Sequence, residues 1–214
     1  MADRIAIVGF AESWKEAPFG DPSIEIWGMN ELYTYDVPRW DRWFELHVGE
    51  SIGLTKRVGG MGVEATDARN AEAKRHATWL RTQPPDKPIY MLDPLFLDGS
   101  VPAAVRYPLE AMCDRFGRYF TSTPAFMLAL AISESPHWIG IYGIDLASDV
   151  EYLNQRPCME YLIGFAQGMG ITVHIPETSA LLKAGHLYGI ETPLVKRNGI
   201  TEELMKGRIR DLRK

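Results

Sequence analysis

The stretch Ile5-Ala6-Ile7-Val8-Gly9 is a short, apolar, partly β-branched run that ends at a glycine. Such a run predicts a strand that is buried on both faces. Further apolar runs of this kind alternate with helical patterns along the chain, and that alternation is typical of a parallel sheet. The sequence therefore predicts an α/β fold with one Rossmann-like domain, in which helices cover both faces of a mostly parallel, twisted sheet. We expect its strands at 4–8, 24–29, 42–47, 88–92, 138–143 and 170–175.

Helical patterns fill the intervals between these strands. Pro84 ends a polar helical stretch at 64–83, because proline lacks a backbone donor and cannot continue a helix. The segment Thr121-Ser122-Thr123-Pro124 is typical of a helix N-terminus, and the apolar run 125–132 follows it. We expect the other helices at 10–17, 103–113, 157–168 and 201–213.

The chain length of 214 residues suits a single domain that spans residues 1–214. A glycine-rich stretch lies inside the interval 48–118, which we interpret as a loop-rich insertion or lid, or else as an elaboration of the same domain. The segment 200–214 is expected to contain a charged C-terminal helix.

The composition excludes several classes of protein. Hydrophobic residues make up 46% of the chain and charged residues 24%, which argues against disorder, and a net charge of −5 argues against a basic nucleic-acid surface. Two cysteines, Cys113 and Cys158, cannot form a disulfide framework or a cysteine-only zinc site. No apolar run approaches the roughly 20 residues that span a bilayer. We therefore expect a cytoplasmic protein with no membrane span, no metal and no resident cofactor.

Ligands of open α/β sheets bind beyond the carboxyl ends of the strands, so the residues that follow each strand are the candidate site. Gly9 permits a close backbone turn, and Ser13 with nearby N–H groups can receive a phosphate, although a tight turn without a ligand explains both residues equally. Thr121, Ser122 and Thr123 head an apolar helix and suit an anion, although ordinary N-capping needs only one of them.

Polar side chains end three further strands. Asn30 and His47 follow neighbouring strands and are candidate site residues. Alternatively, Asn30 only caps a turn, and His47 is a histidine that serves packing. Asp145 ends a later strand, and Glu151 follows in a dense polar cluster. Their carboxylates and the His47 ring are the candidate general bases, unless Asp145 only caps a helix and pairs with a nearby arginine. The same region supplies two further candidate nucleotide ligands, Tyr142 and Arg156.

Five short motifs occur in order along the chain: GFAESW at 9–14, GMNELY at 28–33, TSTPAFMLALAI at 121–132, IGIYGID at 139–145 and IPETSALL at 175–182. Their order and spacing resemble those of the small bacterial sialyltransferases that use CMP-sialic acid, and of their Rossmann-like relatives. Members of that family carry GNGPSL, CNQFY, TSGVYMCAVAIAL, IYLSGID and CPNSLL at the corresponding places. The chain also looks like uncharacterised bacteriophage proteins.

Two departures from this family concern the chemistry. The family's next strand ends in asparagine where this chain has His47. The family segment that holds tyrosines and the histidine taken as general base is shortened here to 146–157, which contains Tyr152 and no histidine. Either Asp145, Glu151 or His47 supplies the base, or the protein binds a nucleotide without transferring a sugar.

The resemblance implies a metal-independent glycosyltransferase that binds a nucleotide or nucleotide sugar. The alternative is a non-catalytic nucleotide-binding protein that sequesters a signalling nucleotide or acts as an assembly partner, and another nucleotide-processing enzyme on the same sheet is a third interpretation. The expected partners are a small-molecule nucleotide and an acceptor such as a modified DNA base or a glycan. A homo-oligomer is left open.

Overall fold

The structure is a computed structural model that describes residues 2–47, 67–92, 100–146 and 150–184. The chain divides into two units, Met1–Leu181 and Leu182–Lys214, and the fold described below is that of the first unit. Within the described ranges, no helix is both long and apolar enough to cross a bilayer.

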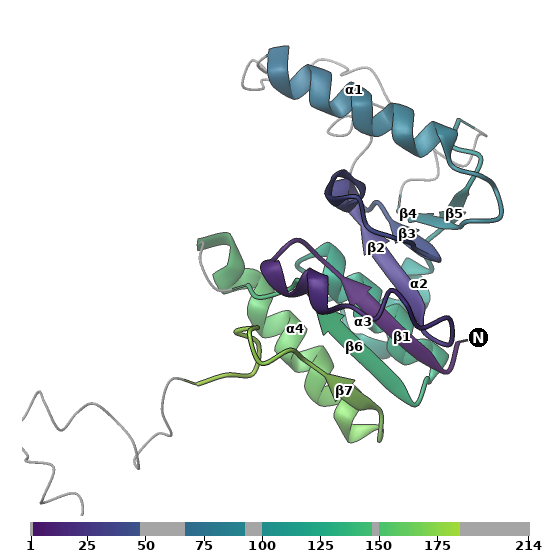
Figure 1. The fold of residues 1–214 in the computed structure, drawn as a ribbon. Coiled ribbons are helices and arrows are strands. Elements are labelled where there is room, and N and C mark those ends of the chain that lie inside the picture. The colour runs from purple at the N-terminus through teal and green to yellow at the C-terminus, as the bar shows by residue number, and fades with distance from the viewer. Residues whose placement is uncertain (1, 48–66, 93–99, 147–149, 185–214) are drawn as a thin grey trace, which may run out of the picture. The chain divides into compact units, whose positions relative to one another are not determined.

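Seven strands form one sheet in which every neighbouring pair is parallel (Figure 1). Their order in the sheet is β5-β4-β3-β2-β1-β6-β7. Strands β2 to β5 therefore lie in sequence order on one side of β1, and β6 and β7 lie on its other side. The predicted Rossmann-like α/β fold is confirmed. The strands are β1 Arg4–Val8, β2 Glu25–Met29, β3 Arg42–Phe44, β4 Ile89–Met91, β5 Ala104–Arg106, β6 Trp138–Tyr142 and β7 Thr172–His174.

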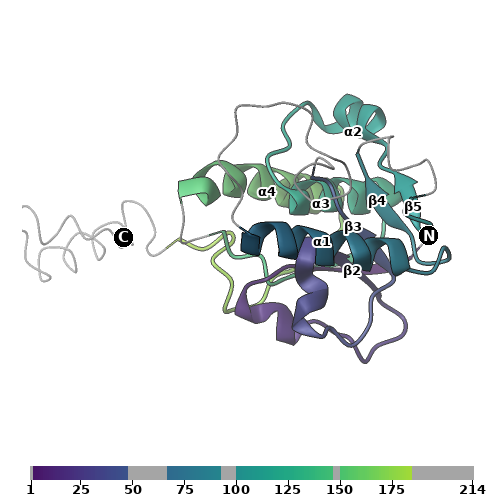
Figure 2. The same cartoon turned by 90° about the horizontal axis from the view of Figure 1, so that it is seen from above.

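Helices cover both faces of this sheet, as Figure 2 shows from above. Alternate residues of a strand point to opposite faces, so Ile5 and Ile7 of β1 pack with the helices of one layer while Ala6 and Val8 pack with the other. The first layer contains α2 Leu109–Phe116, α3 Thr123–Glu134 and α4 Val150–Gly168. The second contains α1 Asp67–Thr82 and the short 3₁₀ helices η1 Glu12–Glu16 and η2 Asn30–Tyr35.

Three predicted elements differ from the structure. The expected helix at 103–113 is wrong, because β5 pairs with β4 and only then does α2 begin, after Pro108. Proline disfavours the helical region for the residue before it, which separates the two elements. Helix α4 begins at Val150 rather than 157, so Pro157 lies inside the helix instead of in its first turn. Strand β3 ends at Phe44, before the predicted end at 47.

The interval 48–118 is predicted to be a loop-rich insertion or lid, or else an elaboration of the same domain. Its described part supplies two strands, β4 and β5, that pair within the main sheet. The helix expected at 201–213 lies outside the described residues, and the single-domain organisation of the whole chain stays a prediction.

Candidate functional site

The topological switch point of the sheet lies between β1 and β6, and the carboxyl ends of these two strands meet at two glycines. The Gly9 N–H donates to the Tyr142 carbonyl at 2.8 Å, and the Ala11 N–H donates to the Gly143 carbonyl at 2.9 Å. A Cβ added at either glycine would lie 2.5 Å from the carbonyl oxygen of the other, and Gly143 has φ +66°. Only glycine fits this crossing, which forms the floor of the site.

The Ser13 side chain binds the backbone of the glycine crossing and does not line the cavity. Its side chain is buried, at 3% exposure, and its hydroxyl accepts a hydrogen bond from the Gly143 N–H at 2.9 Å. The residue predicted as a phosphate ligand is therefore part of the turn between β1 and η1, and it does not line the cavity described below.

Because Ser13 holds a buried N–H group, Ser13→Ala is expected to lower the free energy of unfolding by about 1–2 kcal/mol, the cost of leaving a buried donor unpaired. Urea denaturation followed by tryptophan fluorescence measures this loss. An unchanged free energy of unfolding would contradict the role of Ser13 in the turn.

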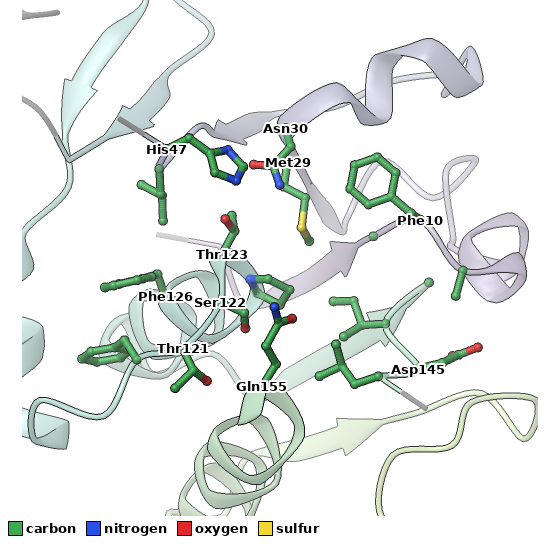
Figure 3. Close-up of a pocket in the computed structure, with 18 residues that line it drawn as sticks. Phe10, Met29, Asn30, His47, Thr121, Ser122, Thr123, Phe126, Asp145 and Gln155 are labelled. Carbon is green, nitrogen blue, oxygen red and sulfur yellow. The ribbon is translucent and has the colours of Figure 1, made fainter. Parts of the chain in front are cut away.

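A cavity of about 860 Å³ opens above the glycine crossing, within the size range of ligand sites in proteins. Its walls come from the ends of β1, β2 and β6, from the segment after β3, and from the beginning of α3, with one residue of α4 (Figure 3). The predicted residues that line it are Gly9, Asn30, His47, Thr121, Ser122, Thr123 and Asp145.

Buried polar atoms without hydrogen-bond partners collect at this cavity. Among the described side chains these atoms are Asn30 Oδ1, Ser122 Oγ, Asp145 Oδ1 and His76 Nδ1, and the first three belong to residues that line the cavity. A buried polar atom left unpaired costs about 1–3 kcal/mol, so such atoms are normally paired with protein, water or a ligand. Their arrangement suits a bound polar molecule.

Ser122 is the N-cap residue of α3, yet its side chain makes no capping hydrogen bond. The alternative interpretation of Ser122 as an ordinary cap is therefore wrong for its hydroxyl. A helix N-terminus carries a partial positive charge and attracts anions. Figure 3 shows Thr121, Ser122 and Thr123 together along this wall of the cavity, which makes the start of α3 a suitable place for a phosphate.

Asn30 lies at the end of β2 with φ +49°, a left-handed conformation that asparagine tolerates better than most residues. The indole Nε1 of Trp43 donates to the Asn30 carbonyl at 3.1 Å and fixes this backbone. The strained turn directs the Asn30 side chain into the site, on the wall opposite Ser122 (Figure 3).

His47 and Asp145 lie at different ends of the cavity (Figure 3). The His47 ring is 49% exposed, and its Nδ1 lies 2.7 Å from Glu45 Oε1. Both residues line the cavity, and their role in proton transfer stays a prediction.

Two predicted nucleotide ligands, Tyr142 and Arg156, lie outside the cavity lining, and the side chain of the candidate base Glu151 is not described. Tyr142 is 5% exposed and packs in the opposite layer, where burial raises the pKa of its phenol. Arg156 Nε donates to Glu160 Oε1 at 2.8 Å, and its Nη2 donates to the Ala180 carbonyl at 2.8 Å, away from the cavity lining. Glu151 lies in α4, and its side chain is not among those that the structure describes.

The site also contains residues for which the sequence predicted no specific role. Phe10 lies at the mouth, 37% exposed, and makes an edge-to-face contact with Tyr35. Phe120 and Phe126 stack on each other with ring centroids 4.6 Å apart. Phe10 directly follows the predicted site residue Gly9, and Phe120 and Phe126 lie close to Thr121, Ser122 and Thr123 in the sequence. The expectation that ligands bind beyond the ends of the strands therefore points to the same stretches. The cavity lining is completed by Ala11, Met29, Leu46, Pro124, Gly143, Ile144, Leu146 and Gln155.

No group of three or more histidine, cysteine, aspartate or glutamate side chains within the described ranges is placed to hold a metal ion. None of the described residues that line the cavity is a lysine or an arginine. Among them, the start of α3 and its hydroxyl groups are suited to contact an anion.

Comparison with known proteins identifies similar folds. No family model matches the chain, and no curated protein matches it at a significant level. A CST-II sialyltransferase variant in complex with CMP is similar with a TM-score of 0.50 at 13% identity, over 94% of this chain and 87% of that chain. CstII from Campylobacter jejuni with the substrate analogue CMP-3FNeuAc has a TM-score of 0.49 at 14% identity, over 80% of each chain. At this identity the similarity shows the fold.

Proposed function

We propose that this chain is a glycosyltransferase that binds a nucleotide sugar in the cavity and transfers the sugar without a metal ion. The observation that carries the proposal is the set of unpartnered buried atoms, Asn30 Oδ1, Ser122 Oγ and Asp145 Oδ1, in a cavity that the positive end of α3 also lines. The amide oxygen of Asn30 and the carboxylate oxygen of Asp145 only accept hydrogen bonds, so the ligand must offer N–H or O–H donors. The start of α3 suits an anionic group. A nucleotide sugar has N–H groups in its base, O–H groups in its sugars and a negative charge on its phosphate.

The CST-II variant of similar fold was determined with CMP, which supports a cytidine nucleotide as the first ligand to test. In our proposal the phosphate lies against the start of α3, where the helix dipole and the hydroxyls of Thr121, Ser122 and Thr123 stabilise the leaving group. Asn30 on the opposite wall accepts a hydrogen bond from the base or the ribose. A sugar hydroxyl donates to Asp145.

The volume of the cavity supports the same proposal. About 860 Å³ accommodates a nucleotide with an attached sugar, and the exposed ring of Phe10 gives one edge of the opening an aromatic surface. Four further points stay predictions. They are the identity of the acceptor as a glycan or a modified DNA base, the cytoplasmic location, the oligomeric state and the bacteriophage source.

Calorimetric titration with CMP, UMP and their nucleotide sugars tests binding. We expect Ser122→Ala to weaken nucleotide binding about 10-fold, because a hydrogen bond to a charged group contributes about 1.5–3 kcal/mol and water partly replaces the hydroxyl. Ser133→Ala is the matched control on the same helix, since the Ser133 hydroxyl donates to the Leu130 carbonyl at 2.7 Å and does not line the cavity.

The outcomes separate the two functions. Release of free nucleotide from a bound nucleotide sugar supports the transferase. Tight binding with every nucleotide sugar left intact would favour the non-catalytic nucleotide-binding protein. If no nucleotide binds, or if Ser122→Ala binds as wild type does, the proposed site is wrong.

A further inference from the structure

A buried carboxylate joins two histidines behind the cavity wall. Glu45 follows β3 and is fully buried, at 0% exposure. Its Oε1 accepts the backbone N–H of His47 at 3.0 Å and lies 2.7 Å from the ring Nδ1 of the same residue. Its Oε2 lies 2.6 Å from Nε2 of His76, which α1 contributes. One carboxylate therefore contacts both rings.

The protonation of these three groups follows from their contacts. Burial opposes ionisation of Glu45, but the hydrogen bonds with His47 and His76, together with the attraction of these rings when they are protonated, outweigh it and lower the pKa of this carboxyl. An ionised carboxylate only accepts hydrogen bonds, so each ring nitrogen that faces it carries a proton. In neutral His47 the proton is then on Nδ1, and the lone pair is on Nε2.

His76 holds the other oxygen of Glu45 in place. It is 0% exposed, and its Nδ1 is buried without a hydrogen-bond partner. A neutral ring with its proton on Nε2 leaves only a lone pair at that buried position, whereas a doubly protonated ring would bury an unpaired N–H. We therefore assign Nε2 of His76 as the nitrogen that donates to Glu45.

Aromatic rings cover this cluster on the side of α1. The ring of Tyr33 stacks on His76 at 5.6 Å and on Trp79 at 4.3 Å, with interplanar angles of 6° and 7°. Burial raises the pKa of the Tyr33 phenol, so Tyr33 is neutral near pH 7. The charged groups that act on this phenol from the surrounding elements are Glu31, Glu45, Glu72 and Arg75.

We propose that Glu45 and His76 are positioning residues that hold His47 with its Nε2 unprotonated, and that this nitrogen accepts the proton of the acceptor hydroxyl. The proposal rests on the proposed glycosyltransferase function. His47 lines the cavity with 49% of its side chain exposed, so the ring reaches a bound acceptor. Asp145, another candidate base, has an Oδ1 atom that no described group orients.

In this step the acceptor hydroxyl gives its proton to His47 Nε2 while its oxygen forms a bond to the anomeric carbon of the sugar. The bond between that carbon and the phosphate oxygen breaks, and its electron pair leaves with the nucleotide. The carboxylate of Glu45 stabilises the imidazolium that results, and it stays ionised throughout. The products are the glycosylated acceptor, the free nucleotide and one proton that His47 later releases to water.

The tautomer of His47 can be measured without any substrate. Long-range ¹H–¹⁵N correlation spectra of the ¹⁵N-labelled full-length protein above pH 7 are expected to show a protonated Nδ1 and an unprotonated Nε2 for His47. In Glu45→Asp this tautomer should persist, and in Glu45→Gln it should give way to a mixture. His137 is the internal reference, because its Nδ1 pairs with Asp3 at 2.7 Å outside the cavity lining. A His47 ring protonated on Nε2 in the wild type would overturn the proposal.

Turnover separates proton transfer from binding. His47→Gln is expected to reduce kcat at least 100-fold while the dissociation constant of CMP changes less than about 3-fold, because the proton moves only in the transition state. His76→Gln and Glu45→Gln should lower kcat, and both should shift the acidic limb of the pH profile, which a purely structural role would not move. His137→Gln should turn over as wild type does. Wild-type kcat in His47→Gln would overturn the proton-acceptor role.

A failure of the proposed function is recognised separately. If the wild type binds no nucleotide, the proposed function fails and the proton-acceptor role fails with it, while the spectra still decide whether Glu45 fixes the His47 tautomer. If the wild type transfers sugar and only Asp145→Asn abolishes turnover, the function stands and the His47 assignment is overturned.

Discussion

Gly143→Ala is expected to lower the free energy of unfolding by about 2–4 kcal/mol, the sum of a strained left-handed residue and an overpacked contact. Gly143 has φ +66°, and the added Cβ would lie 2.5 Å from the Gly9 carbonyl oxygen and 2.7 Å from its carbon. Both neighbours are backbone atoms of Gly9, directly after β1, and cannot rotate away. The strand ends must separate to accept the methyl group.

The control for this prediction is the same substitution at Gly164 in α4, where an added Cβ meets no atom within 4 Å. Gly164→Ala is expected to raise the free energy of unfolding by up to about 1 kcal/mol, because alanine favours a helix interior. Urea denaturation of both variants measures the two opposite signs. A Gly143→Ala variant as stable as wild type would contradict the close crossing of β1 and β6.

The fold class could be predicted from the sequence because each central strand carries its own signal. Ile5 to Val8 and Ile139 to Tyr142 are short runs without charge, as strands buried on both faces require. The order of the strands could not be predicted in the same way, because pairing between β1 and β6 joins residues more than 130 positions apart. No local pattern encodes that contact.

The edge strand β5 was missed for a local reason. Its three residues, Ala104–Arg106, are half-buried or exposed, and they carry no apolar run that marks a buried strand. Their position is fixed by β4, whose Ile89, Tyr90 and Met91 pair with them. The residues that follow form helix α2, Leu109–Phe116. Their helical pattern led to a predicted helix at 103–113, which begins too early because it includes β5.

The rule that ligands bind beyond strand ends located the cavity, but it did not give the direction of each side chain. Asn30, Ser122 and Asp145 follow strands or head a helix, and all three line the cavity with an unpartnered atom. Ser13 follows the same rule, and its hydroxyl instead binds the Gly143 N–H. That outcome depends on the close approach of two distant glycines.

Glu45 shows a signal that sequence reasoning could have used. It stands within Trp43-Phe44-Glu45-Leu46-His47, an acidic residue inside an apolar run, and a buried acid needs partners. One partner, His47, is two residues away, but the other, His76, lies on α1 and reaches Glu45 only through the tertiary structure. The sequence alone could not identify the second histidine.

Glu45→Gln is expected to lower the free energy of unfolding at pH 7 by about 2–3 kcal/mol, because hydrogen bonds to a charged group contribute about 1.5–3 kcal/mol and this carboxylate is fully buried. Glu160→Gln is the control, since Glu160 makes a partly exposed pair with Arg156 on α4 and should lose less than about 1 kcal/mol. Urea denaturation of both variants and the wild type gives the differences.

The loss in Glu45→Gln should depend on pH with a definite sign. The pKa of Glu45 is lowered from its ordinary value of 4.5 in the folded chain, so its stabilisation is fully present above pH 4.5. It is lost as the pH falls through the folded-state pKa. Asp3 and Asp21, whose pKa values are also lowered, are present in both proteins and cancel in the difference. The gap between wild type and Glu45→Gln should therefore close in acid. A gap that stays constant from pH 7 into the acid range would mean that folding does not lower the pKa of Glu45, and the argument that an ionised carboxylate fixes the His47 tautomer would then fail.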